Sequence, residues 1–217
     1  MLPDALITAF ADALDELLAR PVWTDSEGAE RLRREVRVLR AEVRTGNAPG
    51  RIDDLAGALR RVVTAYHEAG HAVAYLRLAP RDRIRLDDVR FTTDEEGILA
   101  PSTTYTFLSE PPWPDPHDAR ELVVEIACLL AGKAAEPTLT HGLRVDGTDL
   151  DDLAEVDDLL LALAPERRHE ALSQARALLL TLDLDRSAAP VAALLYDRWE
   201  AGEPVTTAER IEALLGG

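Results

Sequence analysis

The stretch Thr64-Ala65-Tyr66-His67-Glu68-Ala69-Gly70-His71-Ala72-Val73-Ala74-Tyr75 contains the pattern His-Glu-x-x-His inside an apolar run without proline. The run predicts a helix, and residues four apart in a helix share a face, so His67 and His71 can bind one metal ion together. Glu68 lies one position off that face, where its carboxylate can reach a metal-bound water as a general base must. Small residues at 69, 70, 72 and 74 leave room beside the pair. The alternative is two hydrogen-bonded histidines on an ordinary helix.

Working outward from this helix, the sequence predicts a mainly α-helical fold with a small β element directly after the His-Glu-x-x-His helix. The clearest break is Gly46-Asn47-Ala48-Pro49-Gly50, which divides a helical N-terminal segment, 1–50, from a second domain, 51–217. Asp53 can cap the long helix, and Pro80 stops it. Residues 83–107 read as short strands around an acidic turn. The other helices are predicted at 4–19, 26–45, 118–136, 149–164, 166–182, 187–201 and 206–215.

The charge of the chain is strongly and unevenly negative. The net charge is −16, and residues 81–217 hold 13 basic and 28 acidic side chains. Such an acidic body argues against nucleic acid as a partner. Helix 26–45 differs, because arginines lie on the faces that its apolar stripe leaves open. We expect that stripe to pack within the chain, and a docking surface for a protein partner or a second copy is the alternative.

The N-terminus and the hydropathy favour a cytoplasmic protein. Four acidic residues and no early positive charge in the first 18 positions argue against a secretory signal. No uncharged run approaches the roughly 18 residues that a membrane helix needs, so we expect no membrane association. The sole cysteine, Cys128, lies in an apolar run and is expected to be buried as a small hydrophobe.

A catalytic zinc site needs a third protein ligand, and the residue pattern alone leaves it open. The metzincin pattern fails, because Ala74 and Arg77 stand where glycine and histidine would be required. His117 and His141 are candidates by chemistry, but each is expected in a loop with nothing to orient it. His169 is expected on a solvated helix face. Many carboxylates remain.

At this point four blocks of sequence, in order and spacing, resemble the peptidase domain of FtsH-type zinc proteases. They are 67–73 (His-Glu-Ala-Gly-His-Ala-Val), 97–99 (Gly-Ile-Leu), 129–136 (Leu-Leu-Ala-Gly-Lys-Ala-Ala-Glu) and 147–153 (Gly-Thr-Asp-Leu-Asp-Asp-Leu). The resemblance covers about residues 53–215 and implies a helical, zincin-like fold that binds Zn²⁺. It also implies that the third block is a helix packed against the zinc helix. In the fourth block, the family has an aspartate that is the third zinc ligand at the start of a helix.

Two neighbouring aspartates compete for the third-ligand position. A gapless extension from Gly147 reaches Asp151, whereas a one-residue insertion reaches Asp152. Apolar residues follow Asp152 at helical spacing, so its side chain shares the buried face, and Asp151 points about a third of a turn away. We therefore expect His67, His71 and Asp152 as the metal ligands, with Asp149 as a backup or supporting partner.

We also expect the chain to depart from the FtsH pattern by lacking membrane anchors and an ATPase module. The resemblance then implies an ATP-independent zinc metallopeptidase in which Glu68 is the catalytic base. Its substrates would be peptides, unfolded segments or a specific partner. The strand near Gly97 to Thr106 could present an edge to an extended peptide. The alternative is a proteolytically inactive, peptidase-like interaction or scaffold module.

Overall fold

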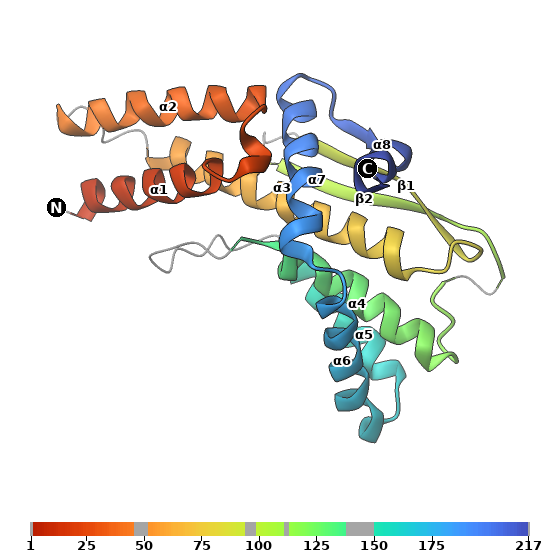
Figure 1. The fold of residues 1–217 in the computed structure, drawn as a ribbon. Helices are drawn as coiled ribbons and strands as arrows, with labels where there is room; N and C mark the ends of the chain where they lie inside the picture. Colours follow the sequence, from red (N-terminus) through yellow and green to blue (C-terminus); the bar gives the residue numbers. More distant parts are fainter. Residues whose placement is uncertain (1, 46–51, 94–98, 111–112, 138–149, 217) are drawn as a thin grey trace.

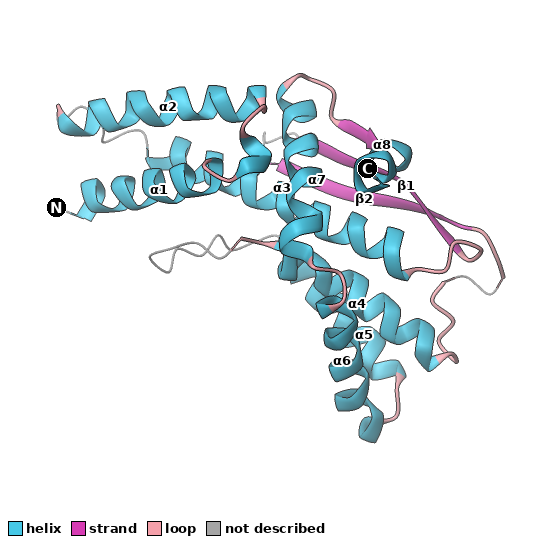
Figure 2. Cartoon of the chain, viewed as in Figure 1, coloured by secondary structure: helices cyan, strands magenta, loops and turns pink. Residues whose placement is uncertain are grey.

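A computed structural model describes residues 2–45, 52–93, 99–110, 113–137 and 150–216. The chain is mainly helical, with one small sheet beside the longest helix (Figures 1 and 2). The helices are α1 (Leu2–Leu18), the short 3₁₀ helix η1 (Pro21–Trp23), α2 (Glu27–Arg44), α3 (Ile52–Leu78), α4 (Ala119–Ala135), α5 (Leu150–Ala162), α6 (Pro165–Leu180), α7 (Leu184–Glu200) and α8 (Ala208–Gly216). The strands are β1 (Ile84–Thr93), β2 (Leu99–Phe107) and β3 (Val205–Thr207).

Helix α3 is the centre of the fold. Every residue from 62 to 75 is buried, because α4, α7 and the sheet pack around the C-terminal part of this helix. A helix covered on all sides needs no polar face, which explains its nearly continuous apolar sequence. Helices α1 and α2 form a hairpin over its N-terminal part (Figure 1). Their buried side chains belong to the same hydrophobic cluster as those of α3 and α7, so the predicted N-terminal segment shares a core with the rest of the chain.

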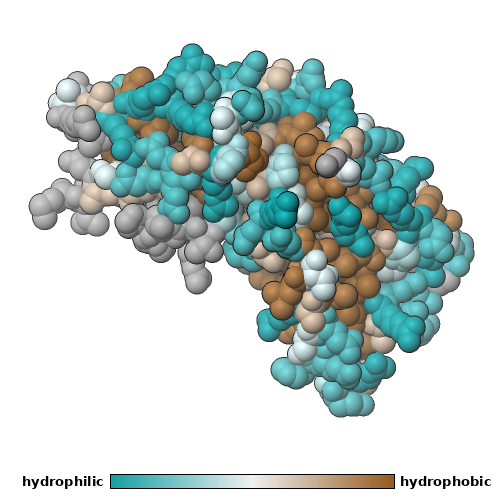
Figure 3. All heavy atoms as spheres, in the orientation of Figure 1, coloured by the Kyte–Doolittle hydropathy of each residue, from teal (hydrophilic) through white to brown (hydrophobic). Residues whose placement is uncertain are grey.

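A second hydrophobic cluster joins α4, α5 and α6. Hydrophobic side chains also gather on the surface of the face shown in Figure 3, along α7 and the helices below it, whereas the surface over α2 is mostly hydrophilic. Among the helices of the described residues, none is both long enough and apolar enough to cross a membrane. The cytoplasmic location stays a prediction.

The sheet has the strand order β2-β1-β3 and is antiparallel throughout. Val89 in the middle of β1 pairs with Thr103 of β2 on one side and with Thr206 of β3 on the other. Strand β2 is therefore an edge strand. Its side chains alternate, so that Thr103 and Tyr105 share the face that contacts α3, as their contacts with Glu68 and Tyr75 show.

The predicted helices and the β element are present, with three differences in detail. Strand β3 was not predicted, because three residues directly before α8 carry too little alternation to be recognised. Helix α7 begins at Leu184, earlier than predicted, and continues through Pro190. Trp113 lies between the predicted strands and the helix predicted at 118–136, where no buried residue was predicted, but it is buried and donates from its Nε1 to Glu125 over 2.6 Å.

Close packing of α3 against α4 sets the geometry of the region that the sequence singled out. A Cβ atom on Gly70 would collide with the backbone carbonyl of Ala131 and lie 2.7 Å from the Cβ of Ala135. Only glycine allows the two helix backbones to approach this closely. This close approach brings α4, at Ala131 and Gly132, next to the two histidines of α3.

Candidate metal centre

His67, His71 and Asp152 converge from two helices that are far apart in the sequence. The Nε2 atom of His67 lies 2.9 Å from Oδ2 of Asp152 and 3.0 Å from Nε2 of His71, and the third side of this triangle measures 3.2 Å. Both histidines are buried, with 1% and 6% of their surfaces exposed, and Asp152 is partly buried on the first turn of α5. This buried group could hold a metal ion.

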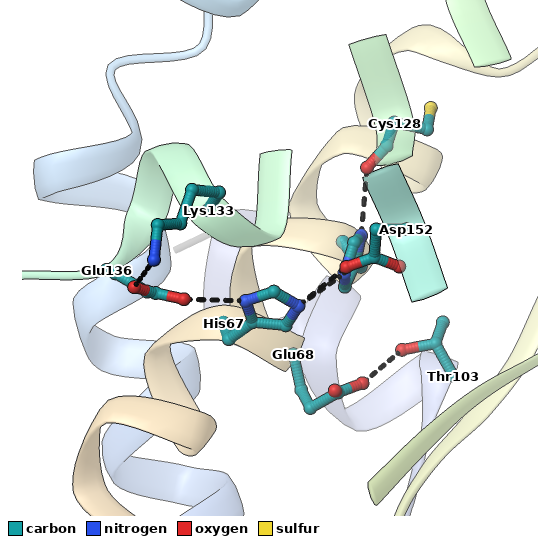
Figure 4. A network of polar contacts seen from close by, with 8 residues as sticks. His67, Glu68, Thr103, Cys128, Lys133, Glu136 and Asp152 are labelled. Carbon is teal, nitrogen blue, oxygen red and sulfur yellow. Dashed lines mark hydrogen bonds and ion pairs between the residues drawn. The ribbon is translucent and has the colours of Figure 1, made fainter. Parts of the chain in front are cut away.

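The outer nitrogen of each imidazole has its own acceptor. Nδ1 of His67 lies 3.0 Å from a carboxylate oxygen of Glu136, whose other oxygen accepts from Lys133 over 2.8 Å (Figure 4). Nδ1 of His71 lies 2.9 Å from the backbone carbonyl of Cys128. A carbonyl or a carboxylate can only accept, so each Nδ1 carries the proton. In the neutral form each Nε2 then directs a lone pair into the space that it shares with Asp152.

Three acceptors that face one another within about 3 Å require a cation or shared protons between them. The pKa values of the three groups reflect this need for a cation or shared protons. Burial lowers the pKa of His67, but the hydrogen bonds with Asp152 and Glu136 outweigh it and raise that pKa to about 9. The pKa of His71 is also raised, since Asp152 outweighs the effect of burial. Burial raises the pKa of Asp152, but the two imidazoles outweigh it and hold that pKa well below its usual value.

The geometry fits a small divalent ion. Ligand atoms about 2.0–2.1 Å from a tetrahedral zinc ion are about 3.3 Å apart, a few tenths of an ångström more than the three distances here. Two imidazoles and a carboxylate are ligand types that zinc accepts. Binding would need only a slight expansion of the triangle.

Gly132 of α4 keeps the space beside the two imidazoles open. A Cβ atom on this residue would lie 2.6 Å from Nε2 of His67 and closer still to Nε2 of His71. Any side chain here would therefore enter the space into which both histidines direct their lone pairs. The absence of a side chain on Gly132 leaves room for an ion.

Glu68 points away from the ligand triangle and toward the sheet (Figure 4). Its side chain is only 6% exposed, and one carboxylate oxygen accepts a hydrogen bond from the hydroxyl of Thr103 over 2.9 Å. Because Glu68 directly follows His67 in α3, its carboxylate lies beside the two histidines and does not enter the space between them. This is the arrangement expected of a base rather than of a ligand.

The other predicted candidates fall into two groups. The side chain of Asp151 is exposed, on a different face of α5 from Asp152, and His117 and His169 are exposed as well. Asp149 and His141 lie outside the described residues. The structure therefore brings together the three residues that the sequence prediction preferred, and their role as ligands remains part of the proposal below.

Three contributors were missed by sequence reasoning. Glu136, Thr103 and Gly132 were not assigned to the site, although Gly132 and Glu136 lie in one of the blocks that carried the resemblance. The signal for Gly132 was available, since a glycine inside an apolar helix commonly marks a close approach. Nothing in the local pattern of β2 distinguishes Thr103 from the threonines beside it.

A buried carboxylate, Glu125, lies next to the part of α4 that contacts His71. Glu125 is 5% exposed and accepts hydrogen bonds from the hydroxyl of Tyr75 and from Trp113. Burial raises the pKa of this carboxyl. Because Glu125 precedes Cys128 by one helical turn, these bonds fix the part of α4 whose carbonyl receives His71.

No protein-family model and no curated protein matches this chain.

Proposed function

We propose that this chain is an ATP-independent zinc metallopeptidase in which His67, His71 and Asp152 hold the metal and Glu68 is the general base. The observation that carries the proposal is the convergence of the three side chains on one space beside Gly132, with Glu68 held next to it. The resemblance of the sequence blocks to FtsH-type peptidase domains supports the same assignment. In the structure, α4, which contains residues 129–135 of the third block, packs against the helix of the two histidines.

The roles of the protein side chains follow from their positions. A zinc ion bound there would supply Lewis acidity to a water molecule and to a peptide carbonyl. Glu68 accepts the proton of the attacking water and passes it to the leaving amine. Glu136 and the Cys128 carbonyl hold the imidazoles in the tautomer that leaves each Nε2 lone pair on the ligand side.

Strand β2 offers the surface on which a substrate could lie. It is an edge strand of the sheet, and Thr103 in its middle touches Glu68. Its sequence carries no charge, unlike the acidic remainder of the chain. Tyr105 and Phe107 are 36% and 47% exposed on the site-facing side. An extended peptide paired with this edge would lie next to the strand that contacts Glu68. Unfolded segments meet this requirement, whereas folded proteins do not.

The direct test is cleavage of casein, an unfolded protein, by the zinc-loaded wild type and by Glu68→Gln. We expect cleavage by the wild type only, with equal zinc content of about one ion per chain in both proteins. Loss of zinc in Glu68→Gln would mean that this residue is a ligand. Equal inertness of both proteins toward a broad peptide library, with zinc bound, would reject the peptidase.

The second candidate is an inactive interaction or scaffold module. A groove of about 460 Å³ between α2 and α3 favours it, because the floor is apolar and charged side chains form the rim. Val38 of α2 is 53% exposed beside this groove. A scaffold, however, requires neither a buried carboxylate at position 68 nor the group of His67, His71 and Asp152. We therefore favour the peptidase over the scaffold. The residues that line the groove are Leu32, Arg34, Glu35, Val38, Leu39, Asp54, Leu55, Ala58 and Arg61.

A further inference from the structure

Glu68 is a buried carboxylate, and its orientation must be set by a partner. A buried acidic group needs hydrogen bonds to offset the loss of water. Within the described residues, the hydrogen bond that reaches the Glu68 side chain comes from Thr103, from Oγ1 to Oε2 over 2.9 Å. This contact joins two residues 35 positions apart, on α3 and on β2.

In the structure, Thr103 lies on a different face of strand β2 from Thr104 and Thr106. Thr104 and Thr106 have their side chains on the opposite face, where their hydroxyls donate to Asp88 and Asp87 of β1. Thr103 is half-buried on the face toward α3, and it pairs with Val89 of β1, which is fully buried. Pairing with β1 fixes the backbone of Thr103, and a β-branched side chain has few rotamers. The hydroxyl is thus held at a defined point in front of Glu68.

We infer that Thr103 is a positioning residue that holds the Glu68 carboxylate beside the ligand triangle, with one oxygen left to accept the proton of the reacting water. The inference rests on the proposed function, because it assigns a partner to the proposed base. Thr103 holds one carboxylate oxygen, so that the carboxylate cannot rotate into the ligand triangle, and the second oxygen remains to accept the proton. The edge strand that would receive the substrate therefore also aligns the base.

Thr103→Val tests this role, because valine keeps the shape of threonine and removes only the donor. We expect kcat for casein-derived peptides to fall about 10- to 100-fold, as for the loss of one hydrogen bond to a charged group, with little change in KM. Thr103→Ser retains the hydroxyl and should restore kcat to within about threefold of the wild type. Thr106→Val is the matched control, since it removes a hydroxyl from the same strand on the opposite face. Equal kcat values in Thr103→Val and Thr106→Val would overturn the inference, as would failure of serine to restore activity.

A binding measurement separates this inference from the peptidase proposal. Acetohydroxamate binds zinc and offers a proton that a neighbouring carboxylate can accept, so its affinity for the zinc-loaded protein reports the orientation of Glu68 without turnover. Thr103→Val should weaken this affinity about fivefold in the presence of Glu68 and change it less than about twofold in a Glu68→Ala background. Equal weakening in both backgrounds would show that Thr103 acts only on the strand and would reject the positioning role. A wild type that shows this coupling but cleaves no peptide would reject the peptidase alone.

Discussion

At the scale of single residues, the candidate site depends on which atom of each side chain is already engaged. The Nδ1 atoms of His67 and His71 are bonded to Glu136 and to the Cys128 carbonyl, so the Nε2 atoms are directed to Asp152. The sequence predicted that His67 and His71 share a face, because residues four apart in a helix lie on the same side. It could not predict Glu136 or Thr103, since those partners depend on how α4 and β2 pack against α3.

The choice of Asp152 over Asp151 leads to a ranking of zinc affinities. The carboxylate of Asp152 lies within 3.2 Å of both imidazoles, whereas the side chain of Asp151 is exposed. Asp152→Asn should reduce zinc affinity at least about 100-fold, and Asp151→Asn should change it less than about threefold. Competition with a fluorescent zinc chelator measures both. The reverse ranking would assign the ligand to Asp151.

Protonation of the imidazoles predicts how zinc affinity changes with pH. Because the pKa of His67 in the metal-free fold is raised to about 9, a zinc ion must displace a proton at neutral pH. Apparent affinity should rise about tenfold per pH unit between pH 6.5 and 9 for each proton displaced. The same proton stabilises the metal-free fold fully below about pH 6.5, and this contribution is lost as pH rises through 9. Zinc titrations at pH 6.5, 7.5 and 8.5 measure the slope, and a plateau above pH 7.5 would contradict the raised pKa.

At the scale of elements, the site is a consequence of how closely α3 and α4 pack. Hydrophobic periodicity predicted both helices, and the resemblance placed them in contact. The closeness of that contact depends on Gly70 and Gly132, whose missing side chains meet Ala131 and the two imidazoles respectively. Strand β3 and the buried position of Trp113 were not predicted, because both result from tertiary contacts with β1 and with Glu125 rather than from local pattern.

Gly132→Ala should therefore remove metal binding while leaving most of the fold intact. The added methyl group would lie 2.6 Å from Nε2 of His67 and closer still to Nε2 of His71, so both imidazoles must move out of the space that they share with Asp152. We expect at least about a 100-fold loss of zinc affinity and a destabilisation of about 1–3 kcal/mol. Metal analysis and thermal unfolding measure the two effects. Gly57→Ala, on the same helix as the histidines but with only the Arg61 guanidinium nearby, is the control and should retain zinc.

At the scale of the whole molecule, the candidate site joins two hydrophobic clusters. His67 and His71 belong to α3, which is the centre of the larger cluster. Asp152 lies in the first turn of α5, which packs into the second cluster through Val156, with Leu163 directly after the helix. Helix α5 packs against α4 and α6. Its contacts with α3 include those of Asp152 with the two histidines. An ion held by all three residues would link the clusters directly.

Metal removal should then lower the stability of the fold, and not only remove activity. An ion that binds only the folded state at 100 times its dissociation constant stabilises that state by about 2.7 kcal/mol. For a chain of this length, the melting temperature should fall roughly 5–10 °C when a chelator removes the zinc, and zinc should restore it. Asp152→Asn should melt at one temperature with or without the chelator, because α5 no longer supplies a ligand. Glu68→Gln should respond to the chelator as the wild type does, since its carboxylate lies beside the ligand triangle and bonds to Thr103 instead. A wild type whose melting temperature is unchanged by chelator, with zinc demonstrably bound beforehand, would show that the ion does not link α5 to α3.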